Sequence, residues 1–313
     1  MRIVLMSAKK QNQRIQRHAF SGPDSRGIIL KGTLPMRFSI SILLLWCASI
    51  CHAASNSPIE AHNANLGEIR LHYKTAGSGI PIVFLHGGSS TSEAWEDYLL
   101  RFADSFRTIA PDGRGQGQSS LGNGPITYGR MAGDVVRLLD HLNVGRVHIV
   151  GHSDGGVVAL HLLIDYPDRI RSATLLGTPY HIDNYPANAC TVLEGYVKAL
   201  AASDPAYESI KSKHAAAKDP QEWLSLVNKL GQMWRTQPTF SEAEIELINT
   251  PVLIVKTDHD FFIPAVVFDR MAELMQGAQI LHLPEGKHSV YRQKSEQVST
   301  AIRAFIREIN NAK

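Results

Sequence analysis

The residues best placed to do chemistry are Ser153 and the glycines on either side of it, in the run Gly151-His-Ser153-Asp-Gly155. An apolar segment precedes this run, and a helical pattern follows it at once. Glycines two residues before and after a serine allow a sharp turn from strand to helix, which presents the hydroxyl above a sheet. The adjacent helix N-terminus favours a reaction that develops negative charge. The pattern predicts a nucleophilic serine, and an ordinary glycine turn is the alternative.

A serine nucleophile needs a general base, and the imidazole that serves as base needs a carboxylate to orient it. The chain contains 14 histidines, so residue type alone does not identify the base. Several of them, such as His141 and His161, fall inside expected helices, where a satisfied or exposed histidine is the usual explanation.

Residues 60–310 resemble an α/β-hydrolase-fold enzyme, because the motifs of that family occur here in the family's order. The motifs are His86-Gly87-Gly88, the serine turn, an acidic loop at 258–264 and a histidine loop at 284–289. The resemblance implies an α/β fold with a mostly parallel, eight-stranded sheet, helices on both faces and an inserted helical cap.

The resemblance also implies roles for an acid and a base. Asp260, four residues before Pro264, matches the catalytic acid, and Asp258 is the alternative, with loop capping as its other role. Lys256 stands where the family often has glycine. His288, on a loop after the last expected strand, matches the catalytic base.

Two further motifs complete the family match. Gly88 and Asp154 are implied to donate the backbone N–H groups of an oxyanion hole. The segment 112–119, Asp-Gly-Arg-Gly-Gln-Gly-Gln-Ser, is similar to the family's D-x-R-G-x-G-x-S stretch, in which Asp112 and Arg114 are structural. This segment lacks the Gly-Lys-Ser/Thr ending of a phosphate-binding loop, so we do not expect nucleotide binding.

The elements needed to position these residues are visible as alternating strand-like and helix-like patterns. We expect strands at 69–73, 80–85, 106–110, 146–150, 170–176, 252–255 and 280–283. Such alternation predicts a mostly parallel sheet covered on both faces. The alternation stops at about residues 180–249, where apolar residues from Trp223 to Trp234 recur at helical spacing. We expect this stretch to form the cap.

An apolar run at residues 38–50 follows Arg37 and is too short to span a bilayer comfortably. These features are typical of a secretory signal peptide, although a buried strand or helix is the alternative. We expect residues 36–53 to be the signal peptide and residues 1–35 to be a non-native extension. The domain would then comprise residues 54–313, in the periplasm or outside the cell, with no stable membrane anchor.

Removal of this leader changes the charge and the cysteine content. The whole chain has a formal charge of +3, but residues 1–53 hold eight of its 32 Lys and Arg and one of its 29 acidic residues. The remaining domain is therefore acidic, at −4, which argues against a nucleic-acid partner. It keeps one cysteine, Cys190, so it has no internal disulfide. No His, Cys or Asp group has zinc spacing, and we expect neither a metal nor a cofactor.

The nucleophile and the residue that follows it narrow the range of expected substrates. Ser153 argues against epoxide hydrolases and haloalkane dehalogenases of this fold, which use aspartate. The stretches 153–156 and 284–288 resemble the valacyclovir hydrolase (biphenyl hydrolase-like) type. That resemblance implies that Asp154 holds the ammonium group of an amino-acid ester, whereas the alternative is that it only complements its helix N-terminus. His86, Trp223 and Trp234 are further candidates for contact with a small-molecule substrate.

The sequence therefore predicts a serine hydrolase that cleaves a small ester, lactone or amide through an acyl-enzyme on Ser153. Perhydrolysis or hydrolysis of a C–C bond with the same triad is one alternative. Binding of a small molecule without turnover is the other. The oligomeric state does not follow from the sequence.

Overall fold

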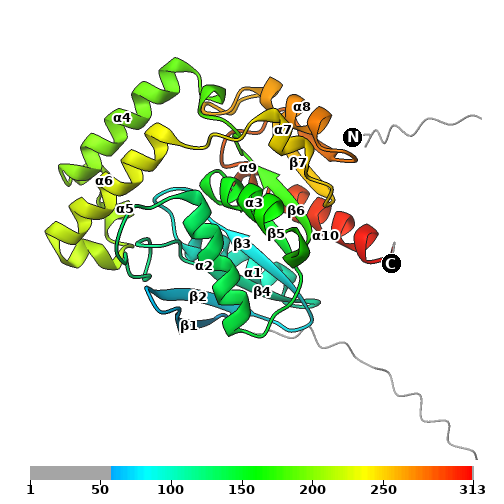
Figure 1. The fold of residues 1–313 in the computed structure, drawn as a ribbon, viewed down its shortest axis with the longest axis horizontal. Helices are drawn as coiled ribbons and strands as arrows, with labels where there is room; N and C mark the ends of the chain where they lie inside the picture. Colours follow the sequence, from blue (N-terminus) through cyan, green and yellow to red (C-terminus); the bar gives the residue numbers. More distant parts are fainter. Residues whose placement is uncertain (1–57, 312–313) are drawn as a thin grey trace, which may run out of the picture. The chain divides into compact units, whose positions relative to one another are not determined.

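Eight strands form one sheet in the order β1-β2-β4-β3-β5-β6-β7-β8 (Figure 1). The computed structural model describes residues 58–311, so the predicted extension at 1–35 and signal peptide at 36–53 lie outside the described residues. The strands are β1 (Glu60–Asn65), β2 (Arg70–Ala76), β3 (Ile80–Leu85), β4 (Phe106–Pro111), β5 (Val147–His152), β6 (Ile170–Leu176), β7 (Val252–Thr257) and β8 (Gln279–Leu283). Among these described strands, only the β1–β2 and β2–β4 pairs are antiparallel. The predicted mostly parallel sheet is confirmed.

Both faces of the sheet are buried, as its continuous apolar strands require. In β3, Ile82 and Phe84 pack into one apolar cluster, whereas Val83 and Leu85 pack into the other. This alternation follows from the two-residue period of a strand.

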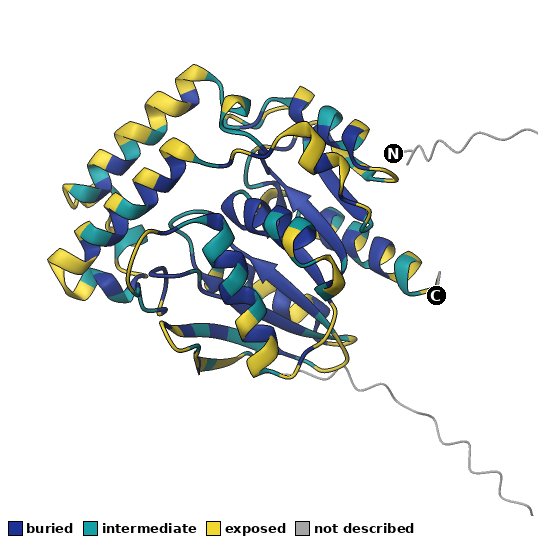
Figure 2. Cartoon of the chain, viewed as in Figure 1, coloured by how far each residue is buried: buried dark blue, intermediate teal, exposed yellow. Residues whose placement is uncertain are grey.

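Helices from different parts of the chain cover the two faces (Figure 1). One face packs against α1 (Glu96–Phe102), α9 (Val290–Gln293) and α10 (Ser295–Asn311). The other packs against α2 (Tyr128–His141), α3 (Asp154–Asp165) and α8 (Ala265–Leu274). In Figure 2 the central strands and much of α3 are buried.

A helical segment lies between β6 and β7, where the alternation of the sequence stops. It contains α4 (Ala187–Ala201), α5 (Glu208–Lys211), α6 (Pro220–Thr236) and α7 (Glu242–Glu246), and we call residues 182–246 the cap segment. In α6 the side chains of Trp223, Leu226, Leu230 and Trp234 are all buried, which the helical spacing predicted. Helix α4 is largely exposed on its outer side (Figure 2).

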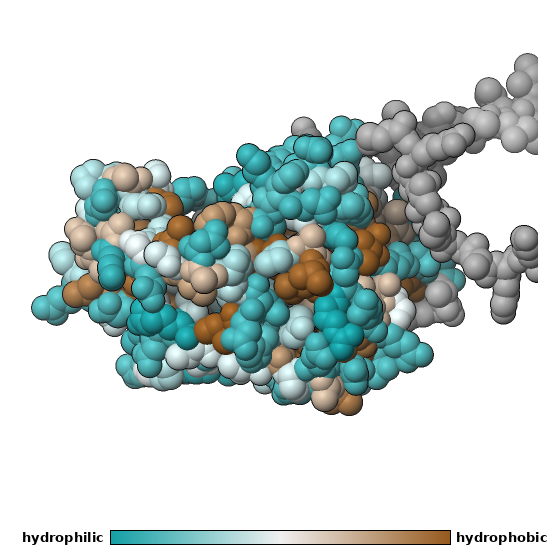
Figure 3. All heavy atoms as spheres, turned by 90° about the horizontal axis from the view of Figure 1, so that it is seen from above, coloured by the Kyte–Doolittle hydropathy of each residue, from teal (hydrophilic) through white to brown (hydrophobic). Residues whose placement is uncertain are grey.

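Hydrophilic residues cover most of the face that Figure 3 shows. On the face shown in Figure 3, apolar residues form small, separate patches among hydrophilic ones. Within residues 58–311, no helix combines the length and the apolar character needed to cross a membrane.

Candidate active site

Ser153 lies at the turn between β5 and α3. Its backbone has φ 53° and ψ −119°, a conformation that is strained for a residue with a side chain. Ser153 N–H donates to the carbonyl of Leu176 at 2.9 Å, which fixes the turn against β6. A side chain at Gly151 would collide with the carbonyl of Gly155, and one at Gly155 with the carbonyl of Leu85. The turn therefore requires glycine at both positions, because neighbouring backbone atoms occupy the space that a side chain would fill.

His288 and Asp260 come together from the loops that follow β8 and β7. The distances from His288 Nδ1 to the two Asp260 oxygens are 3.0 and 2.8 Å. The Asp260 side chain is fully buried, and one of its oxygens accepts the backbone N–H groups of Phe262 (2.8 Å) and Ile263 (3.0 Å). With Nδ1–H donating to this carboxylate, His288 Nε2 is left as the basic nitrogen.

The alternative acid, Asp258, has a different partner. Both of its carboxylate oxygens lie within 3.0 Å of His282 Nε2 near the surface. Lys256, the residue that departs from the family pattern, pairs with Asp269 at 2.7 Å. The structure thus brings Asp260, and not Asp258, to His288.

Gly88 and Asp154 lie beside Ser153 in the wall of the same pocket. Asp154 is the first residue of α3, so its N–H has no partner within the helix. A side chain on Gly88 would come within 2.6 Å of both the Asp154 carboxylate and the Trp234 ring. The loop can approach the serine turn this closely only as glycine, and this approach brings the Gly88 backbone next to the start of α3.

The Asp154 carboxylate is buried and already has two protein donors. Trp234 Nε1–H donates to one oxygen at 2.7 Å, and the Tyr128 hydroxyl donates to the other at 3.0 Å. Burial raises the pKa of Asp154, whereas these two hydrogen bonds favour its charged form and act in the opposite direction. The side chain predicted to hold a substrate ammonium group thus also joins α2, α3 and the cap segment.

His152, directly before the nucleophile, supports the loop that carries the base. Its Nε2–H donates to the carbonyl of His288 at 3.0 Å, and its ring packs against Tyr291 with a centroid distance of 4.8 Å. Burial is the main cause that lowers the pKa of His152 well below its usual value, and the neighbouring His288 acts in the same direction. His152 is therefore neutral at physiological pH.

Ser153 and His288 open into a pocket of about 710 Å³. Its other walls come largely from the cap segment, which contributes Tyr185, Tyr196 and Tyr207 together with Trp234. The Tyr196 hydroxyl also forms a hydrogen bond with Ser89 on the loop after β3. A cavity of this size accommodates a small organic molecule.

Two residues predicted to contact substrate do not line this pocket. The indole N–H of Trp223 donates to the Leu200 carbonyl at 2.9 Å, and the ring is buried inside the cap segment. His86 accepts the N–H of Gly113 through Nε2 at 2.8 Å, so Nδ1 carries the proton and donates to the Gly87 carbonyl at 2.7 Å. Both side chains therefore hold the scaffold, and Trp234 is the predicted tryptophan that reaches the pocket.

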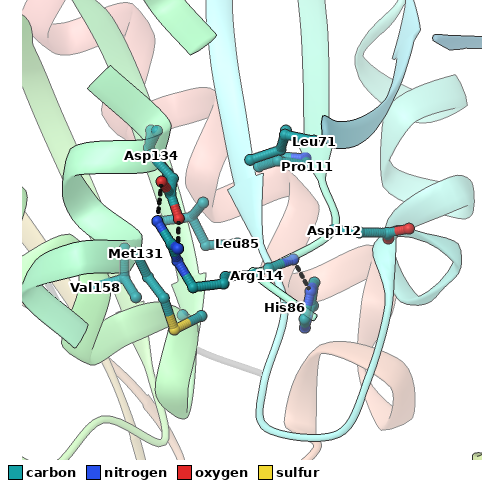
Figure 4. Close-up of a pocket in the computed structure, with 12 residues that line it drawn as sticks. Leu71, Leu85, His86, Pro111, Asp112, Arg114, Met131, Asp134 and Val158 are labelled. Atoms are coloured by element: carbon teal, nitrogen blue, oxygen red, sulfur yellow. Dashed lines mark hydrogen bonds and ion pairs between the residues drawn. The ribbon is translucent and has the colours of Figure 1, made fainter. Parts of the chain in front are cut away.

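Figure 4 shows the surroundings of His86, which enclose a separate cavity of about 20 Å³. Arg114, almost fully buried, makes two hydrogen bonds to Asp134, at 3.0 and 2.8 Å. Asp112 accepts the N–H groups of Ser92 (2.6 Å) and Gln118 (2.8 Å). The predicted structural role of Asp112 and Arg114 agrees with these contacts.

Several pocket residues were missed from the sequence. The pocket is lined by Lys213, Tyr291 and Arg292, and the Tyr128 hydroxyl donates a hydrogen bond to the Asp154 carboxylate. Arg292 follows His288 by four residues, and this spacing was the only available signal for it. Across residues 58–311, no group of three or more His, Cys, Asp or Glu side chains is arranged to hold a metal ion.

Comparison with known proteins identifies the family and the fold. A model of the "Alpha/beta hydrolase family" matches residues 82–301. Serine hydrolase BPHL of Mus musculus is 23% identical over 260 residues, which cover 81% of this chain and 89% of that protein. A soluble epoxide hydrolase of Corynebacterium sp. strain C12 is 36% identical over 121 residues, but these span only 42% of that protein.

Solved structures show the same fold. The crystal structure of E-2-(acetamidomethylene)succinate hydrolase superposes with a TM-score of 0.65 at 24% identity. The alignment covers 80% of this chain and 99% of that one.

Proposed function

The chain belongs to the alpha/beta hydrolase family and is a hydrolase, and we propose that it is a serine hydrolase that acts on a small ester, lactone or amide. The observation that carries the proposal is the pairing of His288 with the buried Asp260 beside a serine held in a strained turn. Epoxide hydrolases of this fold rely on an aspartate nucleophile, and this chain has Ser153 at that position.

In the proposed reaction, Ser153 Oγ attacks the carbonyl carbon of the substrate while His288 Nε2 accepts the hydroxyl proton. Asp260 orients the imidazole and stabilises the imidazolium that forms. The negative oxygen of the tetrahedral intermediate accepts the backbone N–H groups of Gly88 and Asp154. His288 then gives its proton to the leaving group. Water, activated by the same histidine, hydrolyses the acyl-enzyme and regenerates Ser153.

Turnover of p-nitrophenyl acetate by purified residues 54–313 tests this mechanism. Replacement Ser153→Ala is expected to lower kcat by about a thousandfold or more, because the covalent route is lost. Ser212→Ala is the matched control, since Ser212 is exposed and lies outside the pocket lining. A Ser153→Ala variant that keeps the wild-type rate would refute the proposed nucleophile.

We also propose that residues 36–53 direct the domain to the periplasm or out of the cell. The apolar run at 38–50 and the small residues at Cys51 and Ala53 support this. N-terminal sequencing of the exported protein is expected to begin at Ala54. Recovery of the chain in the cytoplasm with its leader intact would contradict it.

A further inference from the structure

We propose that the pocket selects substrates that carry a carboxylate group, and that Arg292 is the residue that recognises it. This inference rests on the proposed function, because it names the class of ester that Ser153 cleaves. It follows from the charges that face the pocket and from the partners that each charge already has.

Arg292 lies on α9, one helical turn after His288, and lines the pocket. Its Nε–H donates to the Tyr291 hydroxyl at 3.0 Å, and its guanidinium carbon lies 5.5 Å from the centre of the Tyr291 ring. The Tyr291 ring in turn packs on His152, the residue that precedes the nucleophile in the sequence. These contacts position the guanidinium group beside the reaction centre.

The two terminal nitrogens of Arg292 remain available. Among residues 58–311, no carboxylate forms an ion pair with this side chain, and its only hydrogen bond is the one that Nε–H donates to Tyr291. An arginine presents its N–H groups in a planar fork that matches the two oxygens of a carboxylate. An exposed, half-satisfied guanidinium at the wall of a pocket is thus suited to an anionic ligand.

The other charged residues of the pocket also favour a negatively charged substrate. Lys213, on the cap segment, lines the pocket and forms an exposed ion pair with Glu93 at 3.1 Å, which solvent screens. Of the described residues, Asp154 is the one carboxylate in the lining, and its two oxygens already accept hydrogen bonds from Trp234 and Tyr128. A negatively charged substrate meets available cations, whereas an amino-acid ester meets like charge at Arg292.

A panel of ethyl esters, extended by two acetate esters, tests the inference. The anionic members are the monoethyl esters of succinic, glutaric and adipic acids, and the neutral members are ethyl butyrate, valerate and hexanoate of equal chain length. Ethyl 4-aminobutyrate supplies the cationic member, and the acetate esters of glycolic and 3-hydroxypropanoic acids place the carboxylate on the alcohol side. We expect kcat/KM for at least one anionic ester to exceed that of its neutral partner by about tenfold.

Substitutions assign this preference to Arg292. In Arg292→Gln the ratio of anionic to neutral kcat/KM is expected to fall to about one, and Arg292→Lys should restore part of it. Arg307→Gln is the matched control, because it removes an equal charge from α10 outside the pocket lining and should keep the wild-type ratio. In wild type the preference should weaken as salt rises from about 0.02 to about 0.5 M.

The outcomes separate this inference from the proposed function. Hydrolysis of neutral esters that depends on Ser153 but shows no preference for the carboxylate would overturn the inference alone. A preference that survives in Arg292→Gln, or a preference for the ammonium ester, would overturn it as well. If no ester in the panel is hydrolysed in a Ser153-dependent manner, the proposed function itself is refuted, and the inference that rests on it is refuted with it.

Discussion

Gly177, after β6, shows how closely single residues are fitted around the proposed base. Its φ is +54°, and a side chain there would come within 3.0 Å of the His288 ring and 3.2 Å of an Asp260 oxygen. A methyl group would therefore strain the backbone and also push on both members of the acid–base pair. This position was not identified from the sequence, because the contact joins two loops far apart along the chain.

We expect Gly177→Ala to lower kcat/KM on p-nitrophenyl acetate by about ten- to a hundredfold, because displacement of a catalytic group by a fraction of an ångström is costly. Gly277→Ala is the control, since Gly277 has φ +78° and a methyl group there would meet no atom within 4 Å. Both variants should lose about 1 kcal/mol of stability in urea unfolding. Equal activity of the two would show that the crowding at His288 is unimportant.

At the scale of elements, the hydrogen bond from Trp234 to Asp154 connects α6 of the cap segment to the start of α3. Trp234→Phe removes this donor and leaves the buried carboxylate with Tyr128 as its single side-chain donor. We expect a loss of about 1–3 kcal/mol in the free energy of unfolding, and a raised KM because the cap wall is less firmly held.

Trp223→Phe provides the matched control for this prediction. It also removes one indole hydrogen bond from α6, but the acceptor is the Leu200 carbonyl within the cap segment. Its effect should be on stability, with KM close to wild type. If both variants raise KM equally, the link to Asp154 has no special role in substrate binding.

The sequence predicted the elements that have a strong pattern and missed those without one. Strands β3 to β8 were found as apolar runs, and α6 was found from its stripe of buried side chains. Strand β1, Glu-Ala-His-Asn-Ala-Asn, was missed as an individual element, because it lies at the sheet edge and only Ala64 is fully buried. Only the family resemblance supplied the count of eight strands.

The candidate site was predictable to the extent that local motifs define it. Ser153 was marked by the glycine turn around it, whereas Asp260 and His288 were identified by their match to the family's motifs, and the structure places these two in contact. His86 and Trp223 were predicted to contact the substrate, because residue type does not show whether a side chain faces the pocket or the interior of the protein. Tyr128 was missed because tertiary packing alone brings it to the site, and Arg292 was missed because its spacing from His288 was its only signal.

For the whole molecule, His214 makes folding stability depend on pH. Its ring is buried against Trp223, and neither ring nitrogen has a hydrogen-bond partner among the described residues. Burial lowers the pKa of His214 to about 4, and His86 and Lys213 act in the same direction, whereas Asp112 and Glu93 oppose them. The unfolded chain therefore binds a proton on this residue more readily than the folded protein does.

The free energy of unfolding is expected to fall as pH decreases from about 6.5 to about 4, by up to about 3 kcal/mol from this group. Denaturant titrations at several pH values measure the slope, and His214→Leu should make it shallower, with the remainder from groups such as the buried His152. His141→Leu, at an exposed position, should leave the slope as in wild type. An unchanged slope in His214→Leu would show that other groups cause the acid sensitivity.

The position of the cap segment has a consequence for how such a protein can be rebuilt. The segment leaves the sheet after β6 and returns at β7, and these strands are neighbours with Leu176 opposite Val255. At the base of the cap segment His181 and Thr239 form an isolated antiparallel bridge, so the stretch between them, which contains α4, α5 and α6, begins and ends at one place. This stretch can be exchanged for a helical insert of another length without moving any strand. Chimaeras joined near His181 and Thr239 would keep Ser153, Asp260 and His288 from this chain while acquiring a foreign binding wall. The substrate range could thus be changed by exchanging the cap while the reacting groups stay the same, provided that the new insert supplies a hydrogen-bond donor for Asp154.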